Sequence, residues 1–354
     1  MHPTEKIELL TVPKNDFDRA SKYLDLIVGQ GNKGYLTSLE EIEGLSFLSE
    51  KLRTNQNAMP LLTVFRLVTA QGANCIVVEH PYLDMDFWTS FSLVHTRSFF
   101  DVSKYGWRLH FFKHKREGHN SIEESLYSGI TMRELTDQGW EYFGFTTIRP
   151  TTSYNIGRTV LRCYPPGIQH YVRSNSPHFA NVGSSHLEVV GVPFLQQDPA
   201  VGMCATASIW SATQILSSGF GLNKFPFADI TRYAIDSPGK SILGGISLDQ
   251  FRGRGLLISE ICEVLRLFGS APLQKLPAEY PGGTRAAFLR FLVYTFVESK
   301  LPVILILKDP KEIVSHAVTV VGHLHPGQLT LKELGRLSRD LTGAGKSSEA
   351  NIFL

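Results

Sequence analysis

The chain has 354 residues, of which 43% are hydrophobic and 19% are charged. This composition is that of a globular protein and excludes a mostly disordered one, and the length suits two domains. The 35 Lys and Arg residues nearly balance the 33 Asp and Glu residues, which leaves a net charge of +2. Binding to nucleic acid or to an acidic membrane surface is therefore not expected.

Nothing in the sequence predicts transport to or across a membrane. The longest apolar run near the end, residues 301–307, is far too short to span a bilayer, so we expect no membrane insertion. The first residues lack the basic stretch followed by an apolar stretch that marks a signal peptide. We therefore expect a cytoplasmic protein, and the sequence leaves its oligomeric state open.

Hydrophobic periodicity predicts a mixed α/β domain of unknown role in residues 1–185. Residues 165–185 are rich in Pro, Ser, Asn and Gly, which predicts a loop, and we place the domain boundary at its end. The elements expected before it are helices at 15–26 and 38–52, strands at 61–68, 75–79 and 108–112, a helix at 131–139, and strands at 142–148 and 159–163.

The pattern changes in residues 186–354, where long helices separate a few strands. Together the two parts predict an α+β protein. The elements expected in the second part are a strand at 187–192, a helix beginning at Cys204, helices at 258–268 and 286–300, and strands at 302–307 and 317–322.

Two patterns in the first part carry little weight as functional sites. The glycines of residues 29–34 fit a dinucleotide fingerprint, but the next helix signal starts too late to face a pyrophosphate, which predicts a surface turn. His110 and the pair Glu79 and His80 are expected to be structural or surface groups.

Metal ligands are equally poorly supported. Asp84 and Asp86 are two acids in a predicted loop, which is a weak signal for a cation. His316, His323 and His325 lie close in sequence, but no acid or thiolate accompanies them at a suitable spacing. We expect neither a metal nor an organic cofactor.

Of the four cysteines, Cys204 has the most informative context. It opens an apolar-periodic helix, and Gln196 and Gln197 precede it. A thiol at a helix N-terminus lies at the positive end of the helix dipole, which lowers its pKa. The N–H groups of the first turn and a glutamine amide can donate to a developing oxyanion. The alternative interpretation is that Cys204 is a small core residue.

A histidine at the start of a later strand completes a pattern suited to thiol chemistry. After the apolar strand at 302–307 and a polar loop, His316 begins a second strand that ends at Gly322. An imidazole near Cys204 can take the proton of the thiol and later donate it to a leaving amine. The two side chains need only meet in space.

These pieces, in this order, resemble the papain-like cysteine peptidases, and most nearly the bacterial branch related to the double-glycine leader peptidases. The resemblance covers about half of the chain, and it implies a helix carrying the cysteine packed on an antiparallel sheet carrying the histidine. The segments that carry it are V-P-F and the glutamines before Cys204, the Ala-rich helix after it, G-L-L-I-S-E-I at 255–261, E-S-K-L-P-V-I-L at 298–305 and S-H-A-V-T-V-V-G-H at 315–323.

The resemblance implies that Cys204 is the nucleophile, that His316 is the general base and acid, and that Gln197 is the oxyanion donor, with Gln196 as the alternative. The implied reaction is hydrolysis of a peptide or isopeptide bond through an acyl-enzyme, with a peptide or protein as the substrate. Two other interpretations stay open: an acyltransferase or transglutaminase-like enzyme, and a catalytically silent peptide-binding module of the same fold.

Papain-like sites also place an Asn or Asp on the strand after the histidine, where it orients the imidazole. The last residues, 351–354, resemble the first half of that strand, so we expect the chain to end just short of the orienting residue. Within the chain, Asp340 and Asn351 are the remaining candidates.

Overall fold

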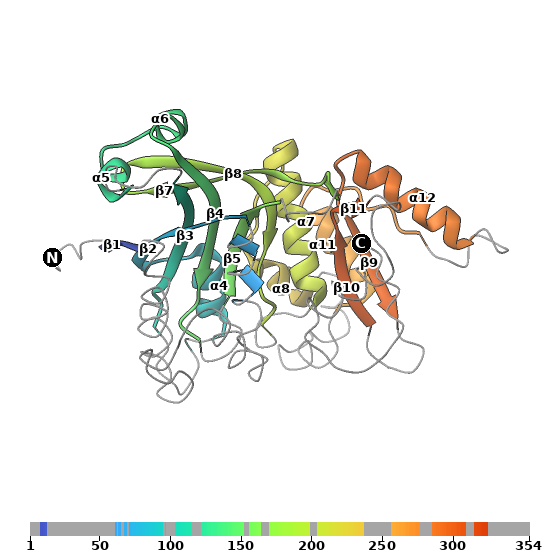
Figure 1. Ribbon diagram of the computed structural model, residues 1–354. Helices are drawn as coiled ribbons and strands as arrows, with labels where there is room; N and C mark the ends of the chain where they lie inside the picture. Colours follow the sequence, from blue (N-terminus) through green and yellow to red (C-terminus); the bar gives the residue numbers. More distant parts are fainter. Residues whose placement is uncertain are drawn as a thin grey trace, which may run out of the picture.

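The computed structural model is a curled antiparallel sheet with helices packed around it (Figure 1), which confirms the predicted α+β class. The predicted helices at 15–26 and 38–52 and the glycine-rich segment 29–34 lie outside the described residues. The structure describes residues 8–12, 61, 63–64, 67–68, 71–94, 96, 103–114, 122–151, 156–163, 170–198, 204–236, 256–275, 285–308 and 315–324.

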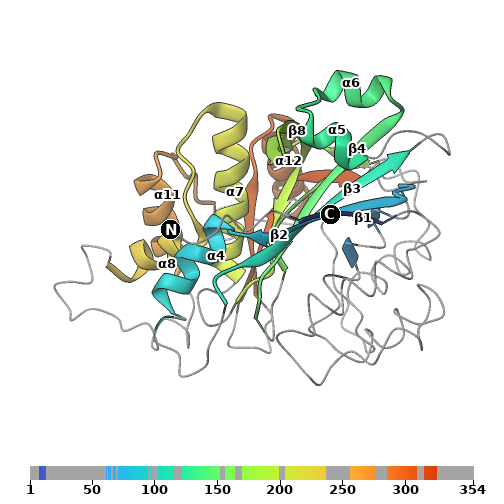
Figure 2. The ribbon, with the colours of Figure 1, turned by 90° about the vertical axis from the view of Figure 1, so that its left-hand side faces the viewer.

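Seven strands form one antiparallel sheet in the order β1-β2-β3-β4-β5-β8-β7. The sheet curls, since side chains of β7 and β8 share a core cluster with side chains of β2 and β3. Figure 2 shows the twisted sheet with α5 and α6 on one side and α4, α7, α8 and α11 on the other. The strands are β1 (Glu8–Val12), β2 (Cys75–Tyr82), β3 (Gly106–His114), β4 (Trp140–Ile148), β5 (Ile156–Arg162), β7 (Ser176–Val182) and β8 (Ser185–Phe194).

A bulge between β3 and β4 contributes to the bend of the sheet. The register shifts between Phe111 and Phe112, opposite Gly144, whose φ of 115° lies in the left-handed region. A Cβ at this position would approach the carbonyl oxygen of Val160 to 2.1 Å, so glycine alone fits. Bulges bend and twist the strand that carries them, so this one adds to the curl of the sheet at β4.

Residues 61–68 correct a prediction. They were expected to be a strand, but every described position among them is helical. Leu61, Val64 and Val68 are buried against one face of the sheet, whereas Leu67 is exposed. This spacing places the buried residues on one side of a helix. A short apolar run fits a strand and a buried helix equally well, so periodicity alone could not separate the two.

The predicted loop at 165–185 is also corrected, because it contains β6 (His170–Val172) and β7. In β7 the buried positions alternate with more accessible ones, but two of the buried residues are Ser176 and His178. Because these inward positions carry polar residues, the sequence lacks the alternation of apolar and polar residues that predicts a strand. The predicted domain boundary at residue 185 falls at the start of β8, which pairs with β5 and β7, so one sheet contains strands from both predicted domains.

A layer of helices packs beside the sheet around its own core, and α7 lies at its centre with ten buried residues. The helix predicted at Cys204 and those predicted at 131–139, 258–268 and 286–300 are confirmed as α7, α6, α11 and α12. The described helices are α4 (Met85–Leu93), α5 (Ile122–Tyr127), α6 (Met132–Asp137), α7 (Cys204–Phe220), α8 (Phe227–Asp236), α11 (Ile258–Leu267) and α12 (Arg285–Glu298).

Two short antiparallel pairs complete the fold beside α7 and α12 (Figure 1). The strand β10 (Ser315–Val320) pairs with β9 (Val303–Lys308), and His316 lies opposite Leu307. The strand β11 (Gly322–Leu324) follows β10 directly and pairs with β6. The chain therefore runs from the strand of His316 back to the segment that leads into β7.

Candidate active site

Cys204 is the first residue of α7, and β10 lies along this helix. The backbone N–H of Ala317 donates to Cys204 Sγ over 3.4 Å, and Thr319 Oγ1 donates to the carbonyl oxygen of Ser208 over 3.1 Å. Four residues along a helix and two along a strand both advance the chain by about 6–7 Å. The two hydrogen bonds therefore match in spacing and fix β10 parallel to the start of α7.

The side chains of His316 and Cys204 interact, and each shifts the pKa of the other. The hydrogen bond from the His316 imidazole is the largest cause that lowers the pKa of the Cys204 thiol, and burial opposes it. Hydrogen bonds from the backbone N–H groups of Ala317 and Ala205 lower that pKa further. In turn, the hydrogen bond to Cys204 raises the pKa of His316. Both shifts favour a thiolate beside an imidazolium.

The accessibility of the pair suits chemistry on an external substrate. Cys204 is partly buried and His316 is exposed. None of the four cysteines forms a disulfide. Cys75 and Cys262 are buried, and burial raises the pKa of the Cys163 thiol, whereas the pKa of Cys204 is lowered.

The two glutamines upstream of Cys204 differ in their exposure to solvent. Gln196 is buried, and its side-chain oxygen accepts from the N–H of Ile156 over 3.2 Å. Its backbone pairs with the carbonyl oxygen of Ile156 and with Arg149. Gln196 therefore fixes the end of β8 to the start of β5. Gln197 is exposed, so its amide is the more accessible of the two as an oxyanion donor.

The candidate orienting residues Asp340 and Asn351 lie outside the described residues, as does His325. The weak cation prediction for Asp84 and Asp86 is not supported: Asp84 caps α4 by accepting from the N–H of Phe87, and Asp86 accepts from Trp210 and from the N–H of Phe227. Within the described part of the chain, no group of three side chains could hold a metal ion.

A cavity of about 500 Å³ lies elsewhere, among β5, β6 and β8. Its lining residues include Arg162, Cys163, Tyr171 and Glu188, but neither Cys204 nor His316.

The contact of Ala317 with Cys204 was not predicted from the sequence, because its donor is a backbone N–H group that any residue would supply.

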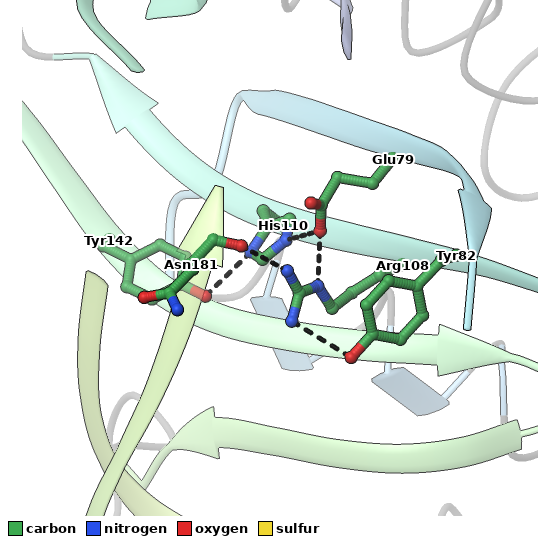
Figure 3. A network of polar contacts seen from close by, with 6 residues as sticks. All are labelled: Glu79, Tyr82, Arg108, His110, Tyr142 and Asn181. Atoms are coloured by element: carbon green, nitrogen blue, oxygen red, sulfur yellow. Dashed lines mark hydrogen bonds and ion pairs between the residues drawn. The ribbon is translucent and has the colours of Figure 1, made fainter. Parts of the chain in front are cut away.

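A second histidine lies in a buried polar network inside the sheet (Figure 3). Glu79 accepts from His110 Nε2 over 2.7 Å and from Arg108 Nε, and His110 Nδ1 contacts the Tyr142 hydroxyl over 2.9 Å. Arg108 also donates to the Tyr82 hydroxyl and to the carbonyl oxygen of Asn181 on β7.

Burial decides the charges in this network. Burial lowers the pKa of His110 to about 4 and raises that of Tyr142. For Glu79, burial acts in the raising direction, but hydrogen bonds from His110 and Arg108 outweigh it and lower the pKa. A neutral His110 therefore donates to an ionised Glu79 and accepts from Tyr142, as expected for a structural group.

No protein-family model, curated protein or solved structure matches this chain. Among the described helices, none combines the length and the apolar character that crossing a membrane requires.

Proposed function

We propose that this protein is a thiol-dependent hydrolase that cleaves a peptide or isopeptide bond through an acyl-enzyme on Cys204. One observation carries the proposal: at the first residue of α7, the thiol of Cys204 accepts from the N–H of Ala317, and its interaction with the His316 imidazole lowers its pKa. An exposed imidazole and an accessible thiol with mutually favourable pKa shifts form the pair that nucleophilic catalysis needs.

The thiolate of Cys204 attacks the carbonyl carbon of the scissile bond, and the carbonyl oxygen takes up the negative charge. The His316 imidazolium then gives its proton to the leaving amine as the carbon–nitrogen bond breaks, which leaves a thioester on Cys204. Neutral His316 next removes a proton from water, whose oxygen attacks the thioester. The acid product leaves, and the proton on His316 restores the starting pair.

The oxyanion of each tetrahedral intermediate needs hydrogen-bond donors. The first-turn N–H groups of α7 and the side-chain amide of Gln197 are the proposed donors. The positive end of the α7 dipole favours the same charge. The arrangement in which a cysteine helix lies against a histidine-bearing antiparallel pair is the basis for proposing a papain-like fold in this half of the chain.

Alkylation of Cys204 by iodoacetamide tests the proposal without knowledge of the substrate. The rate is followed by mass spectrometry of the Cys204 peptide between pH 5 and pH 9 in the wild-type protein and in His316→Ala. We expect wild-type Cys204 to react well below the pH at which ordinary thiols ionise, and we expect His316→Ala to remove that advantage. The Cys163 peptide, measured in the same samples, is the internal control.

Hydrolysis is then measured on a library of fluorogenic peptide amides, with Cys204→Ala as the inactive reference. Retained hydrolysis in Cys204→Ala, or an alkylation profile that His316→Ala leaves unchanged, would refute the proposal. A reactive Cys204 without hydrolysis would instead favour acyl transfer or a silent peptide-binding module over the proposed hydrolase.

A further inference from the structure

Asp86, on α4, accepts hydrogen bonds from two helices of the second part of the chain, and one of these helices, α7, begins at Cys204. Its Oδ1 accepts from the indole Nε1–H of Trp210 over 2.9 Å and from the backbone N–H of Phe227 over 3.0 Å. Trp210 belongs to α7, the helix that begins at Cys204, and Phe227 is the first residue of α8. One carboxylate oxygen thus binds two helices, and α4 lies beside both of them (Figure 2).

This carboxylate is not needed to cap its own helix. Asp84 already does so, since its side chain accepts from the N–H of Phe87. Asp86 instead accepts an orphan N–H at the start of α8, where the helix dipole favours a negative charge. Its second donor, Trp210, is completely buried, so leaving either group unpaired would be costly.

The charges that face Asp86 come from three directions. Asp84 precedes it on the same element, and Arg158 on β5 and Arg149 after β4 approach from the sheet. Burial and the neighbouring Asp84 raise the pKa of Asp86 to about 7, against the opposing effects of Arg158 and the two N–H donors. The N–H groups of Trp210 and Phe227 therefore stabilise the ionised form of Asp86, while burial and Asp84 disfavour it.

The helix α7 is held from two sides. On one side, Cys204 and Ser208 contact Ala317 and Thr319 of β10. On the other side, Trp210 contacts Asp86. A shift or rotation of α7 would change the distance from Cys204 Sγ to the imidazole and to the N–H of Ala317.

We infer that Asp86 is a positioning residue for the nucleophile: through Trp210 and Phe227 it holds α7 where Cys204 Sγ meets His316. This inference rests on the proposed function. It makes the first part of the chain a contributor to the reactivity of Cys204, because α4 belongs to that part.

The test compares Asp86→Ala, Asp86→Asn and Trp210→Phe by the pH profile of Cys204 alkylation with iodoacetamide. Asp86→Ala should raise the apparent pKa of Cys204 by about one unit, which makes alkylation about tenfold slower below that pKa. Asp86→Asn keeps an acceptor oxygen for both donors and should restore most of the rate. Trp210→Phe should slow alkylation less, and Asp86→Ala with Trp210→Phe should be no slower than Asp86→Ala alone.

The control is Asp229→Ala, which removes a partly exposed carboxylate that pairs with Arg232 within α8. All profiles are recorded below the melting temperature of each variant, so that unfolding does not contribute. An unchanged profile in Asp86→Ala, with only a lower melting temperature, would reduce Asp86 to a structural role. Equal losses in Asp86→Asn and Asp86→Ala would also overturn the inference, since charge rather than hydrogen bonding would then act.

The two proposals fail in different ways. If the alkylation profile of wild-type Cys204 is that of an ordinary thiol and is the same in His316→Ala, the proposed function fails. If wild-type Cys204 depends on His316 but not on Asp86, only the positioning inference fails.

Discussion

His110 and His316 are both strand residues that interact with an ionisable partner, yet their environments shift their pKa values in opposite directions. His110 is completely buried, and burial lowers its pKa to about 4 even though Glu79 accepts from it. His316 is exposed, and its hydrogen bond to Cys204 raises its pKa. The first histidine is kept neutral and the second is favoured as a cation.

The difference shows that a partner alone does not make a histidine functional. His110 joins β2, β3 and β4 through Glu79 and Tyr142, and both ring nitrogens are occupied. Neither ring nitrogen of His110 is available to a substrate, because both are hydrogen-bonded inside the sheet. Within the described part of the chain, His316 interacts with Cys204, whose charge it stabilises, and its exposure allows it to exchange protons with solvent.

The same substitution at both histidines should separate these roles. His110→Ala leaves the buried Tyr142 hydroxyl without its partner and removes one of the donors to Glu79, and the unsatisfied group should cost about 1–3 kcal/mol of unfolding free energy. His316→Ala, at an exposed position, should change the stability by less than about 0.5 kcal/mol. Urea unfolding of the two variants measures both values.

Alkylation of Cys204 in the same two variants completes the comparison. The folded fraction of His110→Ala should retain the wild-type profile, whereas His316→Ala should lose it. If His110→Ala proved as stable as the wild type, or if it slowed Cys204 as strongly as His316→Ala, the distinction between a structural and a reactive histidine would be wrong.

The two glutamines before α7 allow a similar comparison. Gln197→Ala should lower kcat by about 10²–10³, as expected for the loss of one oxyanion donor, with a smaller effect on KM. Gln196→Ala should instead destabilise the fold, because the N–H of Ile156 loses its acceptor. Steady-state kinetics on a cleaved peptide amide, with melting temperatures alongside, distinguishes them. The reverse result would assign the oxyanion role to Gln196.

Lowering the pH should destabilise the fold, because His110 binds a proton more readily in the unfolded chain than in the buried network of the sheet. The unfolded chain protonates this histidine near its ordinary pKa of 6.5, whereas the folded chain does so only near 4. Between these values the unfolded state binds more protons, so the contribution of His110 is complete above pH 6.5 and is lost as the pH falls toward 4. Its full size is about 3 kcal/mol.

Urea unfolding at pH 7, 5.5 and 4.5 measures this loss. Glu79 acts in the same direction, since its pKa is also lowered by folding. The variant Glu79→Gln is the comparison, because it removes the carboxylate that His110 contacts. A pH dependence of stability that was flat between pH 7 and pH 4.5 would contradict the assignment of a neutral, buried His110.

The elements that carry the candidate site were predictable from the sequence. The start of α7 at Cys204 follows from apolar periodicity after a proline and glycine turn, and β10 follows from an apolar run headed by His316. Their contact was expected only from the resemblance to a family. Local patterns cannot place two residues side by side when more than a hundred others separate them.

Other features were hidden for identifiable reasons. The strand β7 buries Ser176 and His178, so its inward face does not read as apolar. Residues 61–68 have the composition of a strand, but the described positions among them are helical, and packing of Leu61, Val64 and Val68 against the sheet decides this conformation. Asp86 looked like a weak cation ligand because the sequence does not reveal that Trp210 and Phe227 point their N–H groups at it.

The hydrogen bond between Ala317 and Cys204 joins residues 113 positions apart, which has a consequence during synthesis. The ribosome makes α7 and the whole seven-stranded sheet before it makes β10. At about 5–20 residues per second, the interval between Cys204 and Ala317 lasts roughly 6–23 s. Throughout that time the thiol lacks the imidazole that most lowers its pKa. A nascent chain therefore carries Cys204 in a poorly reactive form, and its nucleophilicity arises only when one of the last strands docks.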